Sequence, residues 1–593
     1  MDLAASLRTL AVATVLLCLA APVCADAERD AVVYSGEINW GAHRHTFATL
    51  QGIVNREGPG LYLKAPFFYH EPVNQAWLDY YQREHDFEYE EIGDFDALIA
   101  RFRPAIRGLV GFDDSPGPKT ARRGKFFPIE EYLATSIGAL TGMLPVPSSK
   151  RESLAQRWGL PAPDEVELLN YDGRRTGVKV RGDLADYGFE TKAQAVIWAL
   201  EAMFPHCSAD YFYNLDHSDV DYAAQHHAFC TNLSYVDTDA GEGLTEKELL
   251  DRILTAYQQR RDKSRPYFWV IGLQPPERVG VMTLSRHGGV NHMTNMAQNW
   301  SFHTQVRSPR SQWRQQAPQG SAPASAETRY VAFIASEGTT HKAAGDGMQH
   351  GAWLDPARGK VAINWGTCAA FATQAPAVVD YYYSTATPRD YFVTGEVCAG
   401  MGFAVPPLMP AEAWQAVLAD ARPLWQAMDL RCIDIYANSG YYDGTVDWPQ
   451  FADMCDALDA LCLTFKNAVR SRGEVMAHGS RFGRGSRALQ VISYPRCPEG
   501  LSHDRMIDFL FDKISSAEGP WGRKFCCIYL PIAALVDRDV DAATTIKASP
   551  SGLLRLQERL NAELGGSVRI VRLDEMVRAC EAGTSDAQDT AVD

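Results

Sequence analysis

From about residue 266 onward, short runs rich in β-branched and aromatic residues alternate with amphipathic segments, and this alternation limits the possible folds most. Strands that alternate with helices form parallel sheets, because each helix returns the chain to the start of the next strand. The runs cover 267–274, 330–336, 361–366, 390–394, 431–436, 474–478, 488–493, 525–530 and 568–573. These nine runs are one more than a TIM barrel needs, so we expect an α/β fold with a TIM-type (β/α) barrel and one run outside it.

An open, doubly wound sheet is the alternative arrangement of the same elements. No glycine-rich dinucleotide-binding motif follows any of the runs, which counts against the nucleotide-binding form of that fold. Among the segments between the runs, the clearest helix is expected over 447–472. Its apolar side chains recur at helical spacing, and they are Phe451, Met454, Cys455, Leu458, Leu461, Cys462 and Phe465.

The first 25 residues have the pattern of a signal peptide. Arg8 precedes an apolar run over 10–21 that is too short to span a bilayer, and Val23 and Ala25 fit cleavage after Ala25. We therefore expect a secreted protein, extracellular or periplasmic, with no membrane segment after cleavage. Because Cys18 and Cys24 lie in the predicted peptide, 11 of the 13 cysteines remain, and their odd number leaves at least one without an intrachain partner.

A chain of 593 residues is too long for one ordinary domain. We expect small α/β subdomains over 26–115 and 116–184, a mainly helical subdomain over 185–265 and the barrel over 266–582. A segment near 305–328, rich in Pro, Ser, Gln and Ala, is predicted to be a disordered insertion, and 583–593 a disordered tail. The net charge of −16 counts against binding to nucleic acid, and no motif predicts a cofactor.

Three acidic residues follow expected barrel strands. Glu277, Glu337 and Glu396 come just after the runs at 267–274, 330–336 and 390–394. Barrel enzymes carry their catalytic residues at the carboxyl ends of strands, and glycoside hydrolysis requires two carboxyl groups that flank the scissile bond. Acids at these positions can also cap the helix that follows. We predict that these three are the catalytic residues.

Polar and aromatic residues at the other strand ends are predicted to bind the substrate. They are Asn364, Trp365, Asp434, Asn438 and His478, and Trp365 offers a flat face on which a sugar ring could stack. His341, Asp346 and His350 could together hold a divalent metal. Their spacing is weak evidence, since Gly345 and Gly347 favour a loop, and we predict no metal site.

The segment GMGFAVP, residues 400–406, resembles the GxGYxYP motif that names a family of secreted proteins described as glycoside hydrolases. Further pieces occur in the order of that family: LQGIVNREGPGLYL near the start, GLQPPERV at 272–279 and YVAFIASEGTT at 330–340. The resemblance implies α/β N-terminal regions and a C-terminal TIM-type barrel. The chain departs from the family pattern at Phe403 and Val405, where the motif has Tyr, and at Thr339, where the family's turn has a second acid.

These features together predict a secreted carbohydrate-active protein whose partner is a glycan substrate. We expect a glycoside hydrolase that uses Glu337 and Glu396 as general acid and as nucleophile or base, with Glu277 as the third candidate. Two alternatives remain open. One is a glycan-binding protein with impaired catalysis, and the other is a metal-dependent carbohydrate deacetylase or esterase with a metal at His341, Asp346 and His350.

Overall fold

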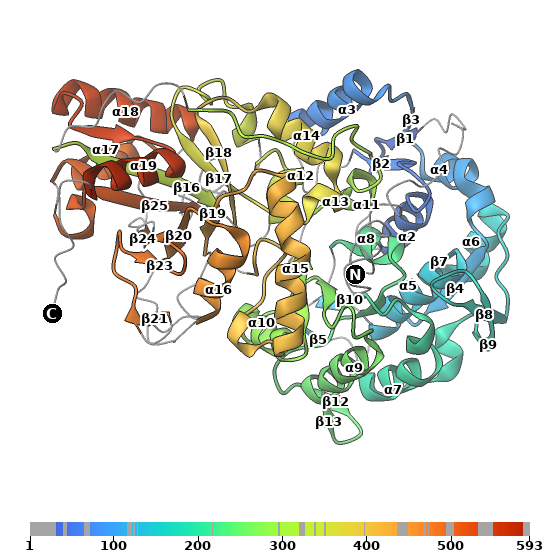
Figure 1. The fold of residues 1–593 in the computed structure, drawn as a ribbon. Helices are drawn as coiled ribbons and strands as arrows, with labels where there is room; N and C mark the ends of the chain where they lie inside the picture. Colours follow the sequence, from blue (N-terminus) through green and yellow to red (C-terminus); the bar gives the residue numbers. More distant parts are fainter. Residues whose placement is uncertain are drawn as a thin grey trace, which may run out of the picture.

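A computed structural model places most of the chain. It describes residues 31–38, 44–64, 71–114, 121–122, 125–126, 128–215, 218–293, 297–318, 327–336, 340–348, 351–395, 398–435, 449–465, 470–471, 474–493, 503–516, 518–531 and 549–584. The predicted signal peptide and the greater part of the predicted tail lie outside these ranges. Figure 1 shows the N-terminal part (blue to teal) and the C-terminal part (yellow to red) at opposite ends of the molecule, with a green central part between them.

The N-terminal part is α/β, as expected, and its strands form small sheets. The first is parallel, in the order β2-β1-β3, from β1 (Ala31–Tyr34), β2 (Leu61–Leu63) and β3 (Tyr89–Ile92). Strands β4 (Gly108–Phe112) and β7 (Met143–Pro147) pair in parallel, and β8 (Glu165–Leu169) and β9 (Arg175–Arg181) form an antiparallel pair. The helices are α2 (Arg44–Val54), α3 (Glu71–His85), α4 (Phe95–Phe102), α5 (Ile129–Thr141) and α6 (Arg151–Trp158).

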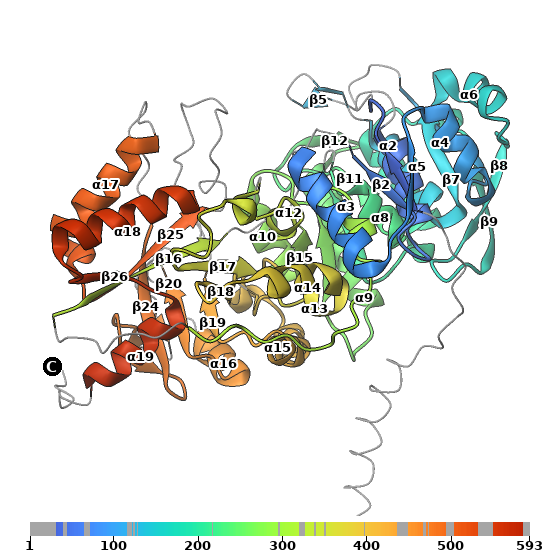
Figure 2. The same cartoon turned by 90° about the horizontal axis from the view of Figure 1, so that it is seen from above.

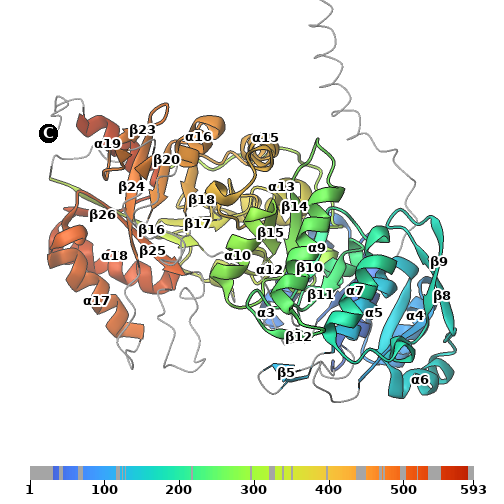
Figure 3. The same ribbon diagram turned by 90° about the horizontal axis from the view of Figure 1, so that it is seen from below.

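The central part is a second parallel sheet, in the order β11-β10-β14-β15. Its strands are β10 (Tyr211–Asn214), β11 (Phe229–Thr231), β14 (Phe268–Ile271) and β15 (Gly289–Met293). Helices α7 (Lys192–Ala202) and α9 (Glu246–Arg260) lie in the segment 185–265 that was predicted to be mainly helical, and α8 (Val220–Gln225) and α10 (Glu277–Arg286) complete this part. Figure 3 shows α9 beside β10 and β14, and the ring of Tyr257 stacks on Phe268 at 5.0 Å. The run at 267–274 therefore belongs to this sheet, and its prediction as a barrel strand is wrong.

Seven parallel strands in the C-terminal part close into a barrel, in the order β16-β17-β18-β19-β20-β24-β25. They are β16 (Arg329–Ser336), β17 (Ile363–Thr367), β18 (Asp390–Thr394), β19 (Cys432–Asp434), β20 (Cys462–Phe465), β24 (Ser486–Ser493) and β25 (Phe525–Pro531). The ring closes where Ile334 and Ala335 of β16 pair with β17. Strand β26 (Val568–Ile570) pairs with the first residues of β16. The closed ring thus has one strand fewer than the TIM barrel we expected.

Two further predictions for the barrel are wrong. The helix predicted over 447–472 is α16 (Pro449–Leu458), and it ends where Asp459 adopts a left-handed backbone with φ of 51°. The apolar stripe then continues into β20, where Cys462 packs in one buried cluster and Leu463 and Phe465 pack in another, as the alternation of a strand requires. The run at 474–478 is not a barrel strand, because β22 (Glu474–Val475) pairs with β21 (Arg470–Ser471) in a hairpin.

Helices cover the outside of the barrel, as Figures 1 and 2 show. They include α14 (Pro376–Thr385), α15 (Ala411–Ala427), α17 (His503–Ser516), α18 (Pro550–Leu564) and α19 (Leu573–Thr584). Within the described ranges, no helix combines the length and apolar character needed to cross a lipid bilayer.

The segment over 305–318 is ordered, so the prediction of disorder is wrong for this part. Trp313 is buried, and its indole nitrogen donates to Asp380 Oδ1 of α14 at 2.6 Å. Gln315 accepts from the backbone nitrogen of Phe392 in β18 at 2.7 Å. The polar composition misled the prediction because these side chains bind other elements rather than water. Residues 319–326 lie outside the described ranges.

Candidate functional site

The central sheet and the barrel meet by the carboxyl ends of their strands. Asn291, near the end of β15, exchanges two backbone hydrogen bonds with Phe403, in the loop after β18, at 2.7 and 3.1 Å. His292 of β15 contacts His341 of α12 (Thr340–Gly345), the helix that follows β16. Loops at the carboxyl ends of parallel strands are where α/β proteins bind ligands. The junction of the two parts therefore lies at the position where a site is expected.

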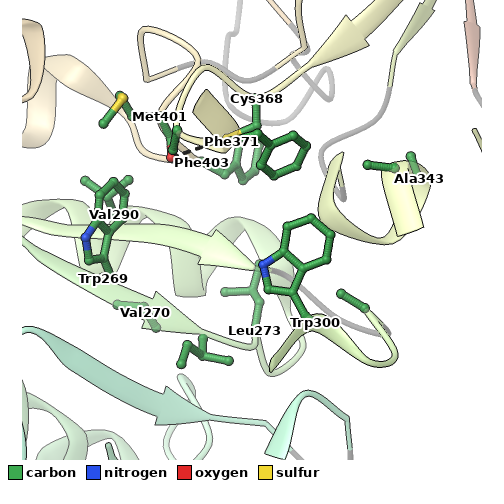
Figure 4. Packing of buried hydrophobic residues seen from close by; sticks show 14 of the residues in the cluster. Trp269, Val270, Leu273, Val290, Trp300, Ala343, Cys368, Phe371, Met401 and Phe403 are labelled. Carbon is green, nitrogen blue, oxygen red and sulfur yellow. Dashed lines mark hydrogen bonds between the residues drawn. The ribbon is translucent and has the colours of Figure 1, made fainter. Parts of the chain in front are cut away.

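The motif at 400–406 packs against β15 at this junction. Gly402 lies so close to β15 that a Cβ atom there would be 2.7 Å from the Asn291 carbonyl oxygen, and Gly400 has a φ of +71° that favours glycine. Figure 4 shows Met401 and Phe403 in the cluster that also contains Trp269, Val290 and Trp300. Phe403 is 2% exposed and Val405 is 6% exposed. These side chains pack two parts of the protein together, so their role in the described structure is structural.

Three strand ends of the barrel touch through small residues. The Ser336 hydroxyl at the end of β16 donates to the Gly395 carbonyl oxygen, just after β18, at 3.4 Å. It passes over Gly366 of β17, where an added Cβ would lie 2.7 Å from Ser336 Oγ. A Cβ at Gly395 would lie 2.8 Å from the same atom. Because the two glycines lack side chains, strands that are not neighbours in the ring come into contact here.

Two of the predicted catalytic residues follow this contact in the sequence, and the third lies at the central sheet. Glu337 and Glu396 directly follow Ser336 and Gly395 in the sequence, and both lie outside the described residues. Glu277 is the first residue of α10 and is exposed at the carboxyl end of β14, in the central sheet. The structure thus assigns Glu277 to the opposite sheet of the junction, and the catalytic roles of all three acids stay predictions.

Two of the residues predicted to bind substrate are enclosed in the protein. Trp365 is 0% exposed, and its indole nitrogen donates to Asp390 Oδ1 at 2.9 Å. Asn364 is also 0% exposed and bridges two segments, since it donates to the Phe333 carbonyl and accepts from the Leu573 backbone nitrogen, each at 2.8 Å. Neither side chain has a surface open to a sugar, so the prediction that they contact a substrate is wrong.

The remaining predicted substrate ligands are divided between the two ends of the barrel. Asp434 is buried at the carboxyl end of β19, where its Oδ1 accepts from the Thr464 hydroxyl at 2.6 Å. Asn438 lies outside the described residues. His478 accepts through Nδ1 from the backbone nitrogen of Gln490, and its ring is close to Phe525, the first residue of β25. Burial, with Arg523 nearby, lowers the pKa of His478 to about 4. It therefore lies toward the amino end of β25, away from Asp434, and the structure does not bring these residues together.

The histidine that sequence reasoning singled out has different neighbours from those expected. His341 Nε2 lies 3.0 Å from His292 Nε2, and Cys368, which directly follows β17, completes a group whose ligand atoms all lie within 4.8 Å of one another. Asp346 is buried elsewhere, with Tyr382 among its neighbours, and His350 lies outside the described residues. His292 was missed because it is distant in sequence from His341, and only the meeting of the two sheets brings them together.

Family models match two segments of the chain. The first N-terminal domain of the GxGYxYP family matches residues 35–104, and the domain described as "GxGYxYP putative glycoside hydrolase C-terminal domain" matches residues 327–477. The chain thus matches both the N-terminal and the C-terminal domain models of the GxGYxYP family. The second match includes the strands β16 to β20, the strand-end contact and the motif loop.

Comparison with solved structures gives the same architecture. A structure described as a "putative hydrolase" from Bacteroides thetaiotaomicron aligns with a TM-score of 0.66 at 15% identity, over 93% of this chain and 94% of that one. At this identity the likeness establishes the fold alone. A "putative polysaccharide deacetylase" from Mycobacterium smegmatis aligns with a TM-score of 0.29 at 11% identity, over 48% of this chain and 99% of that one, which is too low for any argument. Among curated proteins, no sequence matches the chain.

Proposed function

We propose that this GxGYxYP protein is exported and hydrolyses a glycosidic bond at the carboxyl end of its barrel, with Glu337 and Glu396 as the catalytic pair. The observation that carries the proposal is the contact between Ser336 and Gly395. Each catalytic residue directly follows one partner of that contact, and consecutive Cα atoms are about 3.8 Å apart. Each glutamate is therefore bonded directly to one of the two residues that make this contact.

This anchoring suits the chemistry. Retaining glycosidases hold their two carboxyl groups about 5 Å apart, and inverting enzymes hold them about 6.5–9.5 Å apart to admit a water molecule. The proposed pair would have to hold one of these two separations. One carboxylic acid would protonate the leaving oxygen, while the other would attack the anomeric carbon or activate the water.

The central sheet provides the opposite wall of the proposed site. Glu277 is exposed at the carboxyl end of β14, on the sheet whose neighbouring strand β15 pairs with the motif loop. A site between two sheets can bind an extended glycan with more sugar contacts than a single strand end offers. Glu277 is accordingly the candidate for a polar contact to the substrate or for a third catalytic carboxylate.

The test uses the mature protein and a broad panel of oligosaccharides and polysaccharides. Once a substrate that the parent cleaves is found, Glu337→Gln and Glu396→Gln should each lower kcat by about 1,000-fold or more, because each removes a group that acts in the transition state. Glu412→Gln, at an exposed position in the first turn of α15, is the matched control and should keep full activity. Circular dichroism should show the same fold in all variants.

Two outcomes would overturn parts of the proposal. Full activity in both variants would remove the pair from the mechanism. Binding of a glycan without turnover across the panel would instead favour the glycan-binding alternative, to which the replacement of an acid by Thr339 points. Export is tested separately by sequencing the amino terminus of the protein recovered outside the cytoplasm, which should begin at Asp26.

A further inference from the structure

We propose that His292, His341 and Cys368 bind one zinc ion where the central sheet meets the barrel. The three residues come from three separate segments: β15, the helix after β16, and the loop after β17. All are buried, with exposures of 1%, 1% and 0%. Their donor atoms lie within 4.8 Å of one another, although the residues are up to 76 positions apart in sequence. The proposal is independent of the catalytic role of Glu337 and Glu396.

The close approach of the two imidazoles favours a metal ion bound between them. The two Nε2 atoms are 3.0 Å apart, so in the absence of an ion one nitrogen must donate its proton to the other. Either ring can carry its proton on Nδ1, because neither Nδ1 atom has a hydrogen-bond partner among the described residues that would fix its protonation. A cation between the Nε2 atoms would use both lone pairs and fix both rings as the Nδ1–H tautomer.

The surroundings of His292 suit that tautomer. The backbone of Met401 and the side chain of Gln374 lie beside the ring of His292. Histidines that bind a metal commonly donate their second ring nitrogen to a backbone carbonyl group. The motif loop, which contains Met401, would thus support the metal ligand from behind.

The donor set selects the ion. Two imidazoles and one thiolate are nitrogen and sulfur donors, which favour zinc and disfavour magnesium or calcium. Tetrahedral zinc with bonds of about 2.0–2.1 Å to nitrogen and about 2.3 Å to sulfur places the two nitrogens about 3.3 Å apart and each nitrogen about 3.6 Å from the sulfur. The two nitrogens are 3.0 Å apart, and all donor atoms lie within 4.8 Å of one another. Binding therefore requires these distances to change by at most about 1.2 Å.

The binding step is simple to balance. Cys368 Sγ–H loses its proton to solvent as the sulfur–zinc bond forms, and the two neutral imidazoles each supply a lone pair. Three protein ligands leave a fourth coordination position for a water molecule. The ion would tie the end of β15 to the ends of β16 and β17, and it would stabilise the junction.

The experiment measures metal binding by the full mature protein. After treatment with a chelator and its removal, the parent should take up about one equivalent of zinc, and its melting temperature should rise by several degrees. Cobalt(II) in place of zinc should give the ligand-to-metal absorption of a cobalt–thiolate bond. Cys368→Ser should lose that absorption and His341→Gln should lower the affinity at least 10-fold. Cys398→Ser, another buried cysteine near the junction, should behave like the parent.

The chelation experiment needs no variant, so the proposal remains testable if Cys368→Ser does not fold. Failure of the parent to bind zinc or cobalt would overturn it. So would a cobalt complex without the thiolate absorption, or unchanged stoichiometry and spectrum in Cys368→Ser. If Cys368→Ser lost metal binding but hydrolysed the glycan as the parent does, the result would support the zinc site and leave the catalytic proposal standing.

Discussion

The junction and the strand-end contact lie at the same end of the barrel, but they are built from opposite kinds of residue. The junction, formed by Asn291, Trp300, His341, Phe371 and Phe403, is filled by large buried side chains. The strand-end contact consists of Ser336, Gly366 and Gly395, where no larger side chain fits. The large side chains of the junction hold two sheets together. The small residues of the strand-end contact instead leave space at the ends of the strands. We therefore expect changes at the junction to affect stability and changes at the strand-end contact to affect activity.

The largest effect should come from Trp300→Ala at the junction. Trp300 is 0% exposed, and its ring lies 5.1 Å from that of Phe371 and 4.9 Å from that of His341. Removing a buried indole leaves a cavity and should lower the free energy of unfolding by about 4 kcal/mol. Denaturant titration measures this loss. Tyr171→Ala, at a site 53% exposed, is the control and should change stability by less than about 0.5 kcal/mol.

Acid should weaken the packing between the N-terminal part and His303, in the short helix α11 (Trp300–His303). Burial lowers the pKa of His303 to about 3, and its Nδ1 lies 2.6 Å from the Tyr81 hydroxyl. A pKa below the unfolded value of about 6.5 means that the folded protein favours the neutral ring. Its contribution is therefore complete above pH 6.5 and is lost as the pH falls toward 3. Between pH 7 and pH 4 this amounts to about 3 kcal/mol.

His303→Gln provides the measurement for this pH dependence. The parent should lose stability as the pH falls from 7 to 4, and the variant should lose about 3 kcal/mol less over the same interval. If the free energy of unfolding changed equally with pH in both proteins, His303 would not be a source of acid sensitivity. The packing around its ring would then have to relax when the ring is protonated.

The sequence predicted the barrel better than the junction, for a physical reason. Six of the barrel strands lie within about two residues of their predicted positions, because buried parallel strands are short apolar runs that the sequence displays directly. The strand β20 was missed because Leu461, Cys462 and Phe465 continue the apolar spacing of α16. Its true boundary is the left-handed turn at Asp459, a position without the usual glycine.

The junction could not be predicted because its partners come from different sheets. The sequence places Gly400 and Gly402 in a loop, but it does not show that this loop pairs with Asn291. In the same way Trp365 at a strand end resembles a sugar platform until Asp390 is found beside its indole nitrogen. Local patterns indicate which residues form strands and loops, while the contacts between those elements decide which residues are buried.

Two alanine substitutions test the proposed division between stability and activity. Gly402→Ala at the junction would place a methyl group 2.7 Å from the Asn291 carbonyl oxygen and from Val290 Cγ1, which should cost about 2 kcal/mol of stability. Gly395→Ala would place one 2.8 Å from Ser336 Oγ, whose side chain can rotate, so the cost in stability should be smaller. It should displace the start of the Glu396 segment and lower kcat by about 100-fold.

Thermal unfolding and hydrolysis of the identified substrate, measured on both variants, decide the matter. If Gly402→Ala lost activity at a temperature where it remains folded, or if Gly395→Ala lost only stability, the two regions would not be divided as proposed.

The smallest effect is expected at Asp434, inside the barrel. The Thr464 hydroxyl donates to its Oδ1 at 2.6 Å, and a hydrogen bond between neighbouring strands of this kind contributes about 1–2 kcal/mol. A double-mutant cycle with Asp434→Asn and Thr464→Val should therefore give a coupling of about 1 kcal/mol in unfolding. If Asp434 only supports the strands, both single variants should lower kcat/KM equally and by less than 10-fold. A much larger loss in Asp434→Asn alone would instead make Asp434 a direct substrate ligand, because Thr464→Val removes the same hydrogen bond but leaves the carboxylate in place.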